Sequence, residues 1–476
     1  MPVWFHAPSF WIARLVLQRG IGLTYLIAFV VALRQFRPLL GEHGLLPVPR
    51  FLARCRFRDA PSLFHFGYSD RRLVQVAVVG IALSATIVLG VSDALPVALN
   101  VAIWLIVWAL YLSISNIGQT FYSFGWETLL LEAGFLASFL GPASTAVPAP
   151  LIWLFRWILF RVEFGAGLIK MRGDPCWRDL TCLYYHHETQ PMPGRLSWYF
   201  HRLPRAFHRA EVLGSHFAQL VAPVLLFLPQ PIAAYAGLCM AGTQLWLVLS
   251  GNYAWLNFLT IVLTASAFDD ASFRRALPIT PGAVTICAGH DVLVAAVAAL
   301  IVVLSYRPAR NLVSKVQLMN ASFDPLHLVN SYGAFGSVTR KRYEIVIEGT
   351  ADDPFTDETV WQEYEFRGKP TDPNRRPRQW APYHLRLDWL MWFAALSPSY
   401  ARAWFRPFLM RLLENDPATL RLLLRSPFRD RPRAIRATLY LYRFTTWRER
   451  RETGAIWART RVREYFPPTM LERADT

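Results

Sequence analysis

The stretch VALNVAIWLIVWALYLSI, residues 97–114, carries no charged side chain and decides the class of protein. A helix needs about 20 consecutive apolar residues to cross the hydrocarbon core of a membrane. Only helices and closed barrels can span that core, because each backbone polar group must be satisfied internally. Barrel strands alternate apolar and polar residues, whereas this run is apolar almost throughout. The stretch therefore predicts a transmembrane helix.

Similar runs recur through the first two-thirds of the chain, which has 476 residues, 54% of them hydrophobic. The pattern predicts a polytopic α-helical membrane protein with eight or nine transmembrane helices. The count stays open because the eighth run is short enough to be a re-entrant helix. The expected spans are approximately 11–33, 73–92, 95–113, 126–141, 149–171, 210–229, 231–250, 253–268 and 284–305.

The pattern changes after residue 309. The stretches RYEIVIEG at 342–349 and VWQEYEF at 360–366 alternate in the way strands do, and clusters of Pro, Asp and Gly separate them. We expect a transmembrane helical domain over 1–309, followed by a β-rich extramembrane domain over 310–476. Within these domains we expect ordered loops at 34–72 and 172–209 and a helical segment near 385–425.

The formal net charge is +17, and only four of the 50 basic residues are lysines. In a membrane protein, basic loops are expected to lie against anionic lipid headgroups. The bilayer is therefore the expected partner, and because no nucleic-acid-binding motif is present, no nucleic acid is expected. With nine spans, both long loops and the C-terminal domain fall on one face, which arginine counting alone places in the cytoplasm.

One predicted helix carries charges that a membrane disfavours: RWILFRVEFGAGLIKMRGD, residues 156–174. Arg156, Glu163 and Lys170 are seven residues apart, so they share one stripe of the helix. Ionisable groups in a membrane helix face the bundle interior or a wet cavity. We expect an intramembrane ion pair between Arg156 and Glu163, shared in some arrangement with Glu127 or Glu132. The sequence assigns no role to Arg161 and Arg172.

Lys170 allows two interpretations. It is the only lysine before residue 315, and it follows the small residues of FGAG at the end of the helix. Its side chain could simply extend to the membrane surface. Alternatively, a dry pocket would lower its proton affinity and let it act as a base, with Glu163 beside it.

The loop GDPCWRDLTCLYYHHETQPMPGRLSWYFHRLP, residues 173–204, is rich in large rings and should be ordered. Cys176, Cys182, His186 and His187 do not match the usual spacing of zinc ligands, so no metal is expected. Cys176 and Cys182 form either a disulfide, if this face is oxidising, or two free thiols. The chain contains no nucleophile elbow, nucleotide-binding loop or HExxH motif.

Several long blocks resemble the lipase maturation factor family, in the same order. They are QFRPLLGEHGLLPVPRFL, DPCWRDLTCLYYHHETQPMP, LSGNYAWLNFLTI, YGAFGSVTRKRYEIVIEGT and YEFRGKPTDPNRRPRQWAPYHLRLDWLMWFAALS. The resemblance implies a maturation factor without a cofactor or catalysis, whose client is a secreted protein, above all a lipase. Eukaryotic members are multi-pass proteins of the endoplasmic reticulum with a lumenal C-terminal domain. The composition resembles that of a bacterial member, which implies the inner membrane and a periplasmic domain, against the arginine count.

A second resemblance is shorter. AGLIKM followed by DPCW, residues 166–177, is similar to a motif of the vitamin K-dependent gamma-carboxylase-like membrane scaffold. In that motif the lysine matching Lys170 is the proposed base that deprotonates a reduced quinone. The spacing to Trp177 is two residues longer here. The alternative function is therefore a membrane enzyme that uses Lys170, with Glu163, on a quinone or other lipid-like cofactor.

Overall fold

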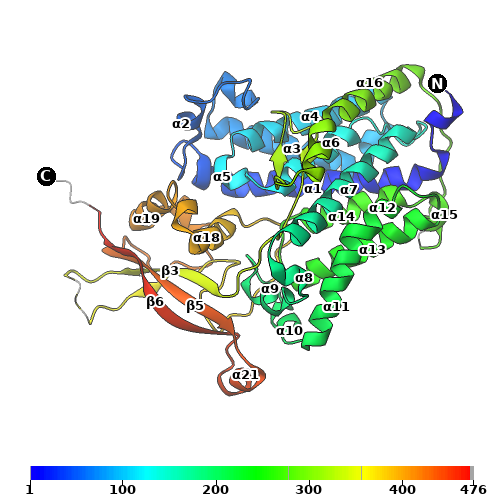
Figure 1. The fold of residues 1–476 in the computed structure, drawn as a ribbon. Helices are drawn as coiled ribbons and strands as arrows, with labels where there is room; N and C mark the ends of the chain where they lie inside the picture. Colours follow the sequence, from blue (N-terminus) through cyan, green and yellow to red (C-terminus); the bar gives the residue numbers. More distant parts are fainter. Residues whose placement is uncertain (1, 277, 355, 357, 472–476) are drawn as a thin grey trace.

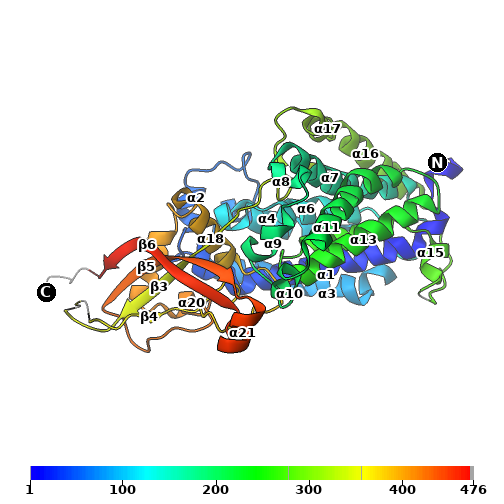
Figure 2. The ribbon, with the colours of Figure 1, turned by 60° about the horizontal axis from the view of Figure 1, so that its bottom comes forward.

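The structure is a computed structural model that describes residues 2–276, 278–354, 356 and 358–471. Figure 1 shows a bundle of helices from the N-terminal part of the chain beside a twisted antiparallel sheet from the C-terminal part. The N-terminus lies at the end of the bundle that is far from the sheet, in both views (Figures 1 and 2).

The bundle is formed mainly by helices of nine or more residues. They are α1 (Trp11–Leu40), α3 (Asp70–Leu89), α4 (Val97–Asn116), α6 (Gly125–Ala137), α7 (Ala149–Arg172), α11 (Arg205–His216), α13 (Ile232–Ser250), α14 (Leu256–Thr264) and α16 (Ala288–Leu304). Shorter helices connect them: η1 (Val3–Phe5), η2 (Pro8–Phe10), α2 (Val48–Leu52), η3 (Leu63–Phe66), η4 (Val91–Ala94), α5 (Gln119–Tyr122), α8 (Pro175–Arg178), α9 (Leu183–Thr189), α10 (Ser197–His201), η5 (Phe217–Val221), α12 (Ala222–Leu225), η6 (Ala265–Ala267), α15 (Asp270–Arg274) and α17 (Tyr306–Val313).

Five helices in the described part of the chain are long and apolar enough to cross a membrane, judged by length and composition. They cover Pro8–Leu40, Asp70–Leu89, Val97–Asn116, Ile232–Ser250 and Ala288–Val313. The count of eight or nine is therefore not confirmed. Helix α7 is long enough to cross a membrane but carries too many charged residues to be counted, while α6 and α14 are too short. The helix that begins with α11 changes to a π-helical turn at η5, just before Pro223.

Local sequence explains where the membrane helices begin and end. At α3 the Ser69 hydroxyl accepts a hydrogen bond from the Arg72 backbone N–H, which caps the first turn. The helix ends at Gly90, whose φ of 85° lies in the left-handed region that glycine adopts without steric cost. Five α3 residues are buried, and the others are exposed or partly exposed, as expected for a helix in contact with lipid.

The C-terminal part contains two small antiparallel sheets. The larger has the strand order β4–β3–β5–β6, formed by β3 (Arg342–Thr350), β4 (Gln362–Glu363), β5 (Ala434–Phe444) and β6 (Trp457–Thr469). The smaller pairs β1 (Ala321–Ser322) with β2 (Asn330–Ser331). In the larger sheet Tyr343 lies opposite Leu441, and the pairing of β5 with β6 contains register shifts. The strand expected at 360–366 is mostly irregular, because Glu365 leaves β3 to pair with Arg425.

Helices cover the sheet on the side nearer the bundle (Figure 1). They are α18 (Arg386–Leu396), η7 (Pro398–Tyr400), α19 (Phe405–Leu413) and α20 (Pro417–Leu420). A further helix, α21 (Trp447–Thr453), connects β5 to β6 along the chain. Of these, α18 packs on β3, α19 on β5, and α20 on α1. The sheet is therefore joined to the bundle through a layer of helices.

A buried ion pair crosses this junction. Arg386 on α18 donates to Glu127 on α6 over 2.8 Å, and both side chains are 0% exposed. Arg386 also donates to the Phe121 carbonyl oxygen over 2.7 Å, and its guanidinium lies over the Tyr122 ring. The Gln35 side-chain oxygen on α1 accepts a hydrogen bond from the Arg386 backbone N–H in the first turn of α18. Glu127 thus pairs with the C-terminal part and not with Arg156, correcting one option of the sequence analysis.

A second set of buried contacts joins the loop after α7 to the sheet. Arg342 at the start of β3 donates to the carbonyl oxygens of Glu188 and Gln190 in this loop. Its other nitrogen donates to Glu344 over 2.6 Å, and Glu344 also pairs with Lys369 at 3.1 Å. The loop after α7 is therefore packed against the sheet through these buried contacts.

Candidate functional site

A cavity of about 510 Å³ lies between the bundle and the C-terminal part. Its walls come from α6, α7, η5, α13 and α14, from the segment 319–337, and from α18. Aromatic residues form much of the lining: Phe124, Trp126, Tyr253, Tyr332, Phe335, Trp389, Trp392, Phe393 and Tyr400. Because both parts of the chain contribute, the cavity exists only while the two are docked.

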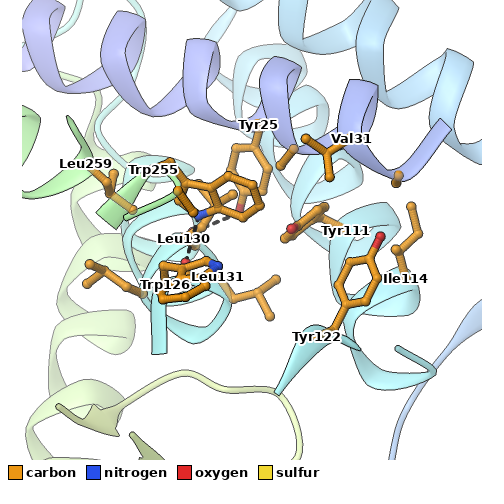
Figure 3. Close-up of a cluster of buried hydrophobic side chains, with 14 of the residues drawn as sticks. Tyr25, Val31, Tyr111, Ile114, Tyr122, Trp126, Leu130, Leu131, Trp255 and Leu259 are labelled. Carbon is orange, nitrogen blue, oxygen red and sulfur yellow. Dashed lines mark hydrogen bonds between the residues drawn. The ribbon is translucent and has the colours of Figure 1, made fainter. Parts of the chain in front are cut away.

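One wall of the cavity is held by the packing shown in Figure 3. The Trp255 indole N–H donates to the Trp126 carbonyl oxygen over 2.9 Å, and the Tyr25 hydroxyl donates to the Leu130 carbonyl oxygen. These bonds tie α6 to α1 and to the residues just before α14. Trp126 itself lines the cavity, so the bond from Trp255 fixes its backbone at the cavity wall.

A chain of buried polar side chains lies on the bundle side of the cavity. The Lys170 ammonium donates to Gln219 over 2.8 Å, and the Gln219 amide donates to Glu163 over 3.2 Å. Gln244 donates to the other Glu163 oxygen over 2.7 Å, and Asn257 donates to Gln244 over 2.6 Å. All five residues line the cavity. A polar floor in an otherwise apolar cavity is a typical arrangement for binding one end of an amphipathic molecule.

Lys170 does not extend to the membrane surface: it is only 7% exposed. Besides Gln219, its ammonium donates to the Ser215 hydroxyl over 3.2 Å and lies 4.4 Å from the Trp177 ring centroid. Lys170 and Phe335 also line a second cavity, of about 500 Å³. The lysine therefore borders two cavities, and the surface-seeking alternative is wrong.

The ion pair predicted between Arg156 and Glu163 is also wrong. Arg156 instead donates to the carbonyl oxygens of Ser266 and Leu226, over 2.8 and 3.0 Å, and its guanidinium lies over the Trp153 ring. The physical reason is distance along the helix, because seven residues correspond to a rise of about 10 Å. Sharing a stripe of the helix was not enough to bring the two charges together.

The sequence analysis missed the buried ion pair of this helix. Arg161 pairs with Glu132 on α6, and both side chains are 1% exposed. Arg161 also donates to the Asn330 carbonyl oxygen over 2.6 Å, and the Tyr332 hydroxyl donates to Glu132 over 2.7 Å. The sequence did offer one indication of this pair: an acidic residue, Glu132, and a basic residue, Arg161, each lie within an apolar helix, and the two helices follow one another in the chain. Like Glu127, Glu132 thus connects the bundle to the C-terminal part.

The loop after α7 closes the site from the other side. Cys176 and Cys182 are joined as a disulfide, with Cα atoms 4.8 Å apart. The Trp177 indole N–H donates to the Phe335 carbonyl oxygen over 2.8 Å. Asp174 pairs with Arg340 at 2.8 Å, and this guanidinium holds the pKa of the Asp174 carboxyl below its usual value. The disulfide loop and the segment 332–340 therefore form one structural unit beside Lys170.

Comparison with known proteins covers both parts of the chain. Residues 12–275 match the family model described as lipase maturation factor transmembrane domain, and residues 328–467 match the lipase maturation factor C-terminal domain. No solved structure matches the chain.

Among the relatives, lipase maturation factor 1 of Bos taurus is 40% identical over 100% of this chain and 91% of its own length. The Homo sapiens protein of that name is 39% identical over 99% of this chain and 90% of its own length. Lipase maturation factor 2 of Xenopus tropicalis is 28% identical over 97% of this chain and 82% of its own length. The chain belongs to the lipase maturation factor family.

Proposed function

We propose that this chain is an integral membrane maturation factor that assists the folding of secreted lipases. The observation that carries the proposal is the identity of about 40% to lipase maturation factor 1, which extends over the whole chain. Both the bundle and the C-terminal part are matched, so the similarity covers the membrane anchor and the domain that would meet a client.

In this proposal the membrane domain has eight or nine spans. The charged helix α7, the short helices α6 and α14, and the broken helix α11–α12 complete the bundle around the five long apolar helices. Support for α7 comes from its buried charges: Arg161 pairs with Glu132, and Glu163 accepts hydrogen bonds from two glutamines. A membrane helix tolerates such groups when they face the bundle interior.

The C-terminal part is proposed to lie on the periplasmic face in a bacterium, or the lumenal face in the endoplasmic reticulum. The disulfide between Cys176 and Cys182 supports this orientation, because disulfides persist in oxidising compartments. Its loop contacts the C-terminal part through Trp177 and Asp174, so both share one face. The arginine count gives the opposite orientation, but it weakens for ordered loops and domains.

A reporter at the C-terminus tests the orientation. A fusion to alkaline phosphatase in a bacterial host should be active, because this enzyme folds only in the periplasm, while a matching GFP fusion should stay dark. Bright GFP fluorescence together with inactive phosphatase would contradict the proposed orientation.

The maturation role is tested by the specific activity of secreted lipase. A host without relatives of this chain is made to secrete a homodimeric lipase, with and without the chain. We expect the chain to raise lipase activity per mole of secreted lipase, with a monomeric secreted enzyme as the unaffected control. In the native host, deletion of the gene with no change in the activity or abundance of any secreted lipase would contradict the role.

One observation favours a second candidate function, a membrane enzyme similar to the gamma-carboxylase type. Lys170 and Glu163 both line the cavity of about 510 Å³, and neither charge is solvated by bulk water. In this alternative Lys170 is the base that removes a proton from a quinone or other lipid-like cofactor. Glu163 acts as a positioning residue, because it reaches the lysine only through Gln219.

The substitution Lys170→Arg separates the two functions. Arginine keeps the positive charge but stays protonated at neutral pH. An enzyme that needs Lys170 as a base should lose about 10²–10⁴-fold in rate, whereas a non-catalytic factor should keep its activity in the lipase assay. The matched control is Lys315→Arg at an exposed position. Full lipase maturation by Lys170→Arg, at normal abundance in the membrane, would eliminate the enzymatic alternative.

A further inference from the structure

Three side chains with metal-binding atoms meet beside the second cavity. His187 comes from α9, whereas His208 and Glu211 lie three residues apart on α11 and so share one face of that helix. Their ligand atoms all lie within 4.8 Å of one another.

The two histidines are buried without a full set of partners. His187 is 3% exposed and His208 is 2% exposed. Among the described residues, neither ring nitrogen of His187 has a partner within hydrogen-bonding distance, although its Nε2 faces Glu211. In the same part of the chain, Nε2 of His208 has no such partner. Buried polar atoms in proteins are nearly always paired, and each exception calls for an explanation such as a bound ion.

The distances suit one shared ion. Nδ1 of His208 is 2.9 Å from one Glu211 oxygen, and Nε2 of His187 is 3.7 Å from the other. Two ligands at about 2.0–2.1 Å from a tetrahedral zinc ion stand about 3.3 Å apart. The two observed separations lie on either side of this value, so small side-chain rotations would bring all three ligands onto one ion.

The chemical types of the three ligands indicate which metals could bind. Two imidazoles and one carboxylate suit zinc and similar divalent transition metals, not the oxygen-only sites of calcium or magnesium. Glu211 also accepts a hydrogen bond from the Trp246 indole N–H over 2.5 Å, an outer contact of the kind that orients a carboxylate ligand. We propose that His187, His208 and Glu211 bind one zinc ion.

This site shares only His187 with the set Cys176, Cys182, His186 and His187, whose spacing does not match zinc. Cys176 and Cys182 are in a disulfide, and His186 bonds the Tyr253 hydroxyl over 2.9 Å. Three protein ligands leave one zinc position for water or another molecule. Glu211 and Lys170 line the same second cavity. A molecule bound at the open zinc position would therefore lie in the cavity that the lysine also borders.

Metal content of the purified full-length chain tests the proposal, independently of lipase maturation. The protein carries a histidine-free affinity tag, is treated with a chelator, is reloaded with zinc and is then washed. We expect one zinc ion per chain by elemental analysis. The variants His208→Gln and Glu211→Gln should each bind zinc at least about 10-fold more weakly.

The matched control is His201→Gln, which alters another histidine beside a glutamate, 3.6 Å from Glu188, and should bind zinc normally. Equal zinc in the wild type and both ligand variants would mean adventitious binding and would overturn the proposal, as would absence of zinc from the wild type. If the variants do not fold, cobalt binding to the wild type is measured in place of zinc binding to the variants. Visible absorption of four-coordinate cobalt that zinc abolishes supports the site, and its absence overturns it.

Discussion

The ion pair between Glu127 and Arg386 holds together the two parts of this protein. Both charges are fully buried, and the pair joins a helix of the membrane bundle to a helix that covers the C-terminal sheet. Removing one partner of such a pair leaves the other charge buried without a partner, which typically lowers the free energy of unfolding by about 3–5 kcal/mol. Its neighbour, Arg161 with Glu132, repeats the arrangement, since Glu132 also accepts from Asn330 and Tyr332. The bundle and the C-terminal part are therefore expected to behave as one body.

The candidate site depends on this docking. The cavity beside Lys170 takes its polar floor from the bundle and much of its aromatic lining from the C-terminal part. Phe335 lines both this cavity and the second one, and its φ of 56° is unusual for a residue with a side chain. Strained backbone of this kind persists only where surrounding structure enforces it. The disulfide loop, through Trp177, holds the carbonyl of that same residue.

The membrane helices and one long strand could be predicted from the sequence, because long apolar runs indicate membrane helices and alternating stretches indicate strands. The five long apolar helices and strand β3 form where these patterns predict them, although almost every β3 residue is buried. The partners of the buried charges could not be predicted, since they depend on packing between distant segments. Arg386 lies 259 residues from Glu127, and a helical stripe wrongly suggested Arg156 as a partner for Glu163. Likewise, Lys170 could be singled out from composition, whereas Gln219 and Gln244 look like ordinary polar residues in apolar helices.

The central claim is that bundle and C-terminal part form one body, and cleavage of the connection between them tests it most directly. A protease recognition sequence is inserted between Lys315 and Val316, both of which are exposed. After cleavage in detergent, the bundle is captured by an N-terminal tag, and the retained fraction of the C-terminal fragment is measured. The account predicts that nearly all of this fragment stays bound, and that Arg386→Met releases much of it. Release of the fragment from the otherwise unchanged protein would contradict the account.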